Sequence, residues 1–175
     1  GSHPPNGDGI NAIVSRNLSL EADPHNFQAM LLVAGQLAQT TKKDDLDKDE
    51  KLKQATKLST DAIATVAAAA KPNPQLTDDQ WTGIKKDLTS QAHETLGIVA
   101  SIDKKWDAAI SEFKTAVDEA ANPEPSTMVR LAITYGNAKK YDDAIAMADR
   151  AMASPGASDA VNTTAEFDDI KVSLP

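Results

Sequence analysis

Apolar residues recur three and four positions apart through most of this chain, with polar residues between them. This spacing gathers apolar side chains on one face of a helix. Prolines and charged runs divide the pattern, and it predicts eight helices, over residues 9–21, 25–40, 47–70, 77–102, 106–121, 126–137, 141–153 and 158–172. Sustained alternation of apolar and polar residues, which indicates a half-buried strand, is found nowhere in the sequence. We therefore predict an all-α fold of about eight helices.

Local signals sharpen two of the helix boundaries. Thr77 and Gln80 are spaced as in a capping box, in which a hydroxyl and a side-chain amide satisfy the free N–H groups at a helix start. The run 41–51 is almost entirely charged. It predicts either an exposed loop or the solvated beginning of the helix that follows.

One pattern of small, aromatic and apolar residues is written twice, and corresponding positions such as 96 and 131 are 35 residues apart. The first copy holds Leu96, Gly97, Ala100, Trp106, Ala109, Ile110, Phe113 and Ala116. The second copy holds Leu131, Ala132, Tyr135, Tyr141, Ala144, Ile145, Ala148 and Ala151. A fixed period near this length, with two helices per unit, is typical of stacked helical repeats.

The spacing of these small, aromatic and alanine positions, closed by Pro123 and Pro155, resembles the tetratricopeptide repeat (TPR) family. The resemblance implies an antiparallel helix-hairpin solenoid, a TPR-like superhelix. It divides a single domain, residues 9–175, into a partial repeat (9–24), a first unit (25–74) with the charged insertion 41–51, a second unit (77–123), a third unit (125–155) and a capping helix (158–172).

Residues 1–8 stand outside this scheme. Gly1-Ser2-His3 is typical of the remnant of a cleaved tag, and the Pro- and Gly-rich residues after it predict a flexible N-terminus. The helical pattern then begins with what resembles the second helix of a repeat. The chain is therefore expected to be either a complete module or a fragment of a longer repeat protein, and the sequence leaves both open.

Charge narrows the choice of partner. The net charge is −8 and the isoelectric point about 4.8, whereas a protein that binds a phosphate backbone needs a basic face. We therefore expect no nucleic-acid partner. Apolar runs are too short to span a bilayer, so direct membrane insertion is not expected either. The absence of cysteine leaves the compartment open between the cytoplasm and, if a signal peptide has been removed, the periplasm or exterior. The oligomeric state is also open.

Acidic residues at alternate positions suggest a calcium site at first sight. Asp45, Asp47 and Asp49 match the opening of an EF-hand loop, but that loop requires glycine at its sixth position and glutamate at its twelfth. Glu50 and Thr56 occupy those positions. A solvated charged loop is the better interpretation, and we predict no metal site there.

Catalytic motifs are likewise incomplete. His93-Glu94 could begin a zinc-protease helix, but Gly97 stands where the second histidine is required. Phosphate-binding loops and serine-nucleophile elbows do not occur in the sequence. We therefore expect a protein that is not an enzyme and uses no cofactor. Trp106 and Tyr141 occupy the aromatic position of the repeat, which favours a packing role, whereas Trp81 lies outside the pattern.

The resemblance also implies where a partner would bind. In TPR arrays the first helix of each unit lines a concave groove, and the matching positions here are Gln28, Leu31, Gly35, Ala38, Gln91, Glu94, Ile98, Ser101, Ser126, Val129, Ile133 and Asn137. The expected function is a non-catalytic interaction module that holds a peptide or helix of a protein partner. The alternative is a structural fragment that packs against further repeats of a larger protein or assembly.

Some TPR domains carry a clamp for the terminal carboxylate of a peptide. The clamp positions match Leu31, Gly35, Thr95, Ser126 and Arg130, of which only the arginine agrees with the clamp. A single guanidinium does not provide the several converging donors that such a carboxylate needs. We therefore predict that acidic chaperone-tail peptides do not bind.

Overall fold

The computed structural model describes residue 23 and residues 25–157, and within these ranges it is all-helical, without a strand. The six helices are α2 (Phe27–Thr40), α3 (Lys48–Ala68), α4 (Asp78–Ile102), α5 (Trp106–Glu119), α6 (Pro125–Asn137) and α7 (Tyr141–Ala153). Each agrees closely with a predicted helix. The helices predicted over 9–21 and 158–172 lie outside the described residues.

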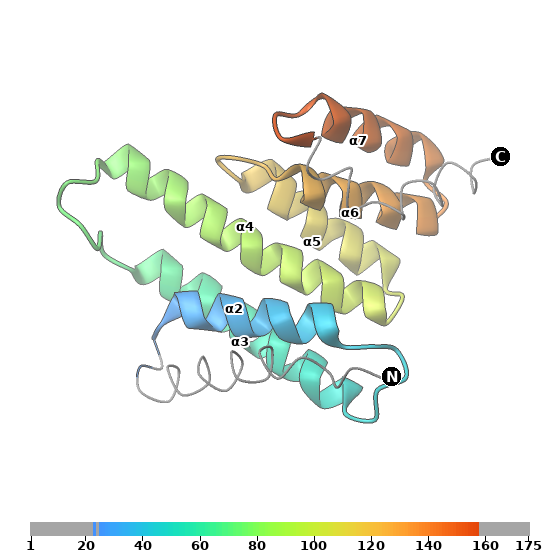
Figure 1. The fold of residues 1–175 in the computed structure, drawn as a ribbon, viewed down its shortest axis with the longest axis horizontal. Coiled ribbons are helices and arrows are strands. Elements are labelled where there is room, and N and C mark those ends of the chain that lie inside the picture. The colour runs from blue at the N-terminus through green and yellow to red at the C-terminus, as the bar shows by residue number, and fades with distance from the viewer. Residues whose placement is uncertain (1–22, 24, 158–175) are drawn as a thin grey trace, which may run out of the picture.

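The helices form three antiparallel pairs that follow one another along the molecule, α2 with α3, α4 with α5 and α6 with α7 (Figure 1). Each helix also contacts the next one along the chain, and α2 lies against α4. The turns that join the two helices of each pair lie at the same edge of the molecule (Figure 1). This arrangement places α4 centrally, with α2 and α3 on one side and α5 and α6 on the other.

Capping groups fix where several helices begin. The Asn26 side chain accepts a hydrogen bond from the Ala29 N–H at 3.0 Å, which satisfies a free donor at the start of α2. The predicted capping box of α4 is confirmed, because Gln80 N–H donates to the Thr77 hydroxyl at 3.1 Å and Thr77 N–H donates to the Gln80 side chain at 2.9 Å. Pro125 opens α6, where its missing N–H is not needed.

The α4–α5 and α6–α7 turns have the same backbone conformation. Lys104 and Lys139 both adopt left-handed backbone angles, with φ of 56° and 61°. In each turn the next lysine donates its N–H to the carbonyl five residues earlier, from Lys105 to Ala100 and from Lys140 to Tyr135, both at 2.9 Å. These bonds have the Schellman pattern that ends a helix and reverses the chain.

The charged run 41–51 contains both an exposed loop and the beginning of the next helix, the two structures predicted for it. Residues 42–47 form a loop, and α3 begins at Lys48. The Lys51 ammonium group binds Asp47 at 2.9 Å and Asp45 at 3.4 Å, which folds the loop back onto the first turn of the helix. Among the described residues, this is the only long loop between the two helices of a pair, and these ion pairs hold it in place.

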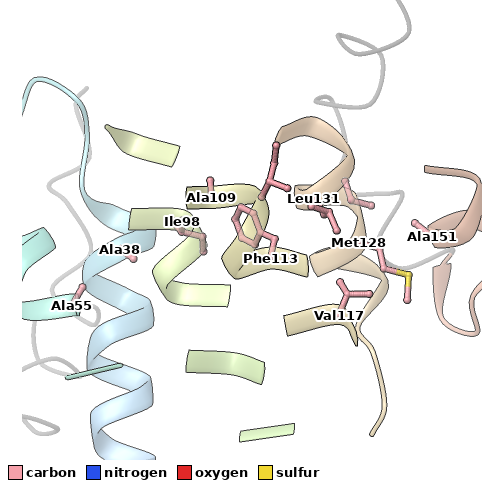
Figure 2. Packing of buried hydrophobic residues seen from close by; sticks show 11 residues of the cluster. Ala38, Ala55, Ile98, Ala109, Phe113, Val117, Met128, Leu131 and Ala151 are labelled. Carbon is pink, nitrogen blue, oxygen red and sulfur yellow. The ribbon is translucent and has the colours of Figure 1, made fainter. Parts of the chain in front are cut away.

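A single core cluster passes through all six helices (Figure 2). Its members are Ala38, Ala55, Ile98, Ala109, Ile110, Phe113, Val117, Met128, Val129, Leu131 and Ala151. The Phe113 ring lies between Ile98 of α4 and Leu131 of α6 in the close-up view (Figure 2). The aromatic residue of one helix pair therefore joins it to the next, which explains how few large side chains suffice for the core.

Close approach within the α4–α5 pair depends on a glycine. A Cβ atom added at Gly97 would lie only 2.7 Å from the Phe113 ring. Such a contact is far inside van der Waals distance, so the ring occupies the volume that a side chain at position 97 would need. The small residue of the repeat pattern is therefore required by packing at this position.

Candidate functional site

Two adjoining cavities lie between α4 and α6, and we call them together the α4–α6 groove. Arg130 of α6 lines one of them and Glu94 of α4 the other, and these two side chains form an ion pair with 3.2 Å between Nε and Oε1. One cavity extends from this ion pair toward the carboxyl ends of both helices, and the other toward their amino ends. At this ion pair α4 and α6 are bridged by the side chains of Glu94 and Arg130.

The carboxyl-end cavity is mainly apolar and has a volume of about 300 Å³. Its lining consists of Ile98, Ser101, Ile102, Trp106, Phe113, Arg130, Ile133, Thr134 and Asn137. A volume at the lower end of the usual range for ligand sites suits one or two side chains of a partner rather than a large cofactor. We call this part of the groove the anchor cavity.

The amino-end cavity has more charged residues in its lining and a volume of about 410 Å³. Its lining consists of Ile84, Asp87, Leu88, Ser90, Gln91, Glu94, Asn122, Glu124 and Thr127. Three of these residues are carboxylates and none is a lysine or arginine. We call this part the acidic cavity.

The Glu94–Arg130 pair separates the two parts and is incompletely buried. The Glu94 side chain is 22% exposed and the Arg130 side chain 40%. Burial raises the pKa of Glu94 above its ordinary value, and the opposing effects of the Arg130 charge and a hydrogen bond from Thr127 do not overcome it. One guanidinium therefore compensates this carboxylate only in part.

Other polar contacts hold the walls of the groove in place. Asn122, in the loop before α6, donates its N–H to Asp87 at 3.0 Å and its side-chain amide to the same carboxylate at 2.9 Å. The Ser90 hydroxyl donates to the Ala116 carbonyl at 2.6 Å, and His93 Nδ1 lies 2.7 Å from a Glu112 carboxylate oxygen. These bonds tie α4 to α5 and to the loop that leads into α6.

The two tryptophans have different surroundings from those their sequence positions suggest. Trp106, at the repeat's aromatic position, is only partly buried and lines the anchor cavity. Trp81 is buried, and the Lys85 ammonium group lies 5.6 Å from its ring centroid while donating to the Ala67 carbonyl at 2.9 Å. Lys85 thus joins α4 to α3 beside Trp81, whereas Trp106 offers an aromatic surface to the groove.

Six of the nine principal groove candidates lie in the two cavities. Ile98, Ser101, Ile133 and Asn137 line the anchor cavity, and Gln91 and Glu94 line the acidic cavity. Gln28 is exposed on α2, away from both cavities. Leu31 and Val129 are buried, with 2% and 5% exposure. Leu31 belongs to a small cluster with Met30, Ala62 and Ala92, and Val129 belongs to the main core.

The remaining positions that the resemblance assigned to the groove divide in the same way. Ser126 is exposed, Gly35 is partly buried and Ala38 is in the core. Sequence reasoning did not assign Trp106, Ile102 or Thr134 to the groove. The spacing of Arg130, Ile133, Thr134 and Asn137 on α6 is the signal that could have found the α6 wall, because these positions share one helical face.

Asp45, Asp47 and Asp49 do not converge on one point. The first two carboxylates bind Lys51, and the Asp49 side chain is 95% exposed. In residues 25–157 no three histidine or acidic side chains are placed so that they could hold a metal ion. None of the helices in this part of the chain is long and apolar enough to cross a membrane.

Comparison with protein-family models, with curated proteins and with solved structures found no match for this chain. The interpretation of the groove therefore rests on its own residues and geometry.

Proposed function

We propose that this chain is a TPR-like helical-repeat module that binds a peptide or helical segment of a protein partner in the α4–α6 groove. In this proposal the three helix pairs are successive units of a solenoid. The first helices of the second and third units, α4 and α6, form the binding surface together with Trp106 at the start of α5. The chemistry is recognition rather than catalysis.

The observation that carries the proposal is the anchor cavity. Trp106, Ile98 and Ile133 present apolar surface around a space of about 300 Å³ that water can enter. Filling such a space with an apolar side chain removes apolar surface from water and is favourable. Two polar residues of its lining can orient the backbone of a bound segment: Asn137 can donate or accept, and Ser101 can accept, because its hydroxyl already donates to the Gly97 carbonyl at 2.9 Å.

A structural role in a larger assembly remains the second candidate, and it has its own supporting observation. Ile145 is 46% exposed and Met152 is 52% exposed, and their spacing of seven residues places them on one face of α7. Such a face is suited to packing against a further element. The two roles are compatible, because the α4–α6 groove and this face of α7 use different residues.

Selection from a display library of randomised 12-residue peptides tests the proposed function. Peptides enriched on the native protein are retested on Asn137→Trp, which places a bulky neutral side chain at the mouth of the anchor cavity. Gln54→Trp, at an exposed position of α3, is the matched control. We expect the first substitution to weaken binding by about tenfold, which corresponds to about 1.4 kcal/mol, and the control to have no effect. Equal affinities for the two variants would contradict binding in this groove.

A further inference from the structure

The charges that flank the anchor cavity are of opposite sign on its two sides. Toward the amino end of α4 lies the acidic cavity, with Asp87, Glu94 and Glu124. On the other side of Trp106, a shallow depression is lined by Lys104 and Lys105 together with Asp107. A segment lying along the groove therefore meets carboxylates before the anchor cavity and lysines after it.

The three carboxylates differ in how far they are already compensated. Asp87 accepts two hydrogen bonds from Asn122, a neutral residue that brings no opposing charge. Glu94 shares its charge with Arg130 at 3.2 Å. Glu124 is exposed, and among residues 25–157 its carboxylate has no hydrogen-bond or ion-pair partner. With one guanidinium against three carboxylates, this side of the groove retains a negative charge.

We propose that the occupant of the α4–α6 groove is a protein segment with an apolar anchor residue and a lysine or arginine on one side of it only. The anchor fills the cavity beside Trp106, and the cation lies among Glu94, Glu124 and Asp87. This inference rests on the proposed function and specifies its ligand. The partly compensated Glu94 carboxylate gains a second cation from such a ligand, which strengthens the electrostatic complementarity of the two surfaces.

The geometry of α4 sets the spacing between the two ligand residues. Glu94 precedes Ile98 by one helical turn, and a helix rises about 1.5 Å per residue, so the two sites are about 6 Å apart along the groove. An extended segment covers this distance in about two residues, at about 3.3 Å each. A helical segment covers it in four. The cation is therefore expected two positions from the anchor in an extended ligand and four positions away in a helical one.

The same randomised 12-residue library tests this inference through the composition of the peptides it yields. We expect peptides whose binding is lost on Asn137→Trp to share a large apolar residue with lysine or arginine at a fixed spacing, always on the same side. The lysines beyond Trp106 disfavour a cation on the opposite side. Selected peptides that depend on the anchor cavity but carry no basic residue, or carry basic residues equally on both sides, would overturn the inference and leave the proposed function standing.

A charge-removal series then assigns the contact. Glu124→Gln should weaken the selected peptide about two- to fivefold, as expected for a solvent-accessible ion pair. Glu50→Gln, an exposed glutamate of α3, is the control and should leave affinity unchanged. Replacing the ligand's basic residue by glutamine should produce a loss at least as large, because the cation lies among three carboxylates, and Glu124→Gln should then add nothing further. Independent, additive losses would overturn the assignment of this carboxylate to the ligand's cation.

Salt dependence and an acidic probe complete the test. Raising the salt concentration should weaken the basic peptide more than its glutamine variant, because ions screen exposed charges. A matched peptide with glutamate in place of the basic residue should bind more weakly than both. Stronger binding by the acidic peptide would overturn the inference. If the library yields no peptide at all, the proposed function and this inference both fail.

Discussion

The two copies of the 35-residue pattern fold into similar helix pairs, α4 with α5 and α6 with α7. One pair of corresponding residues nevertheless differs sharply in burial. Ile110 of α5 is 8% exposed, while Ile145, its counterpart on α7, is 46% exposed. Ala109 and Ala144 are both buried, as are Ala116 and Ala151. Ile110 belongs to the core cluster that includes Met128 and Leu131 of α6, whereas Ile145 does not belong to it. In the part of the chain that the structure describes, α6 covers α5 and no corresponding helix covers α7.

The contact between first and second helices also differs between the copies, in a complementary way. The first copy combines Gly97 with Phe113, and the second combines Ala132 with Ala148 at the same two positions. Compared with the first copy, the second has an additional methyl group on its first helix, at Ala132, and lacks the ring on its second helix, at Ala148. The small position and the large position therefore form one packing unit, and this explains why the repeat tolerates different residues at each site.

The largest expected effect is at Phe113, which is 2% exposed. Phe113→Ala removes a buried ring that joins three helices and should lower the free energy of unfolding by about 3–5 kcal/mol. Chemical denaturation measures this change. A loss below about 1 kcal/mol would mean that the ring is not the centre of the core.

The pairing of the two positions gives a more specific outcome. Gly97→Ala alone should destabilise the protein by about 1–3 kcal/mol, because the added methyl group overlaps the ring. In the Phe113→Ala background the same substitution should be neutral or stabilising, since the space is then free. Gly136→Ala is the control, where an added Cβ meets no atom within 4 Å, and it should stabilise α6 by about 0.5–1 kcal/mol. Additive effects at 97 and 113 would contradict the packing unit.

The isoleucine pair tests the effect of the covering helices directly. Ile110→Ala should cost about 2–5 kcal/mol, the usual range for a buried aliphatic residue. Ile145→Ala should change stability by less than about 1 kcal/mol, because the residue is already half exposed. Thermal or chemical unfolding of the two variants side by side provides the comparison. Similar losses would show that another element covers Ile145.

The smallest expected effect is the same in both copies. Lys104 and Lys139 have left-handed backbone angles, which favour glycine over residues with a side chain. Lys104→Gly and Lys139→Gly should each stabilise the protein by about 0.5–1 kcal/mol, after the greater unfolded-state entropy of glycine is subtracted. Chemical denaturation of the single and double variants should give additive gains. A gain in only one turn would show that the two turns are not energetically equivalent.

The helices could be predicted closely from the sequence because each carries its own signals. The apolar spacing identifies them, and the Thr77 capping box identifies where one of them begins. The sequence predicts the start of α6 one residue later, at Ser126, whereas the helix begins at Pro125 with Glu124 as its N-cap. The groove could be predicted only in part. A Cβ atom added at Gly35 would lie 3.8 Å from the Thr95 hydroxyl oxygen, so α2 lies close against α4. This approach buries neighbouring Leu31, and no periodic pattern gives the distance between two helices.

The surroundings of Trp106 could not be predicted for a similar reason. The repeat pattern gives its position but not the number of neighbours that cover its ring. It stands at the first position of α5, beside the turn, where the ring reaches the carboxyl ends of α4 and α6. Phe113 lies in the middle of the same helix, where neighbouring residues cover its ring from both sides. Position along the helix, rather than residue type, separates the core aromatic residue from the one in the groove.

The central claim is that the α4–α6 groove is the surface that binds a partner segment. Amide chemical-shift mapping of the labelled protein during titration with a library-selected peptide tests it most directly. We predict that the largest shifts fall at residues 98–102, at Trp106 and at residues 130–137, and that they disappear in Asn137→Trp. Shifts concentrated instead on α2 and α3, or on the exposed face of α7 around Ile145, would contradict the claim.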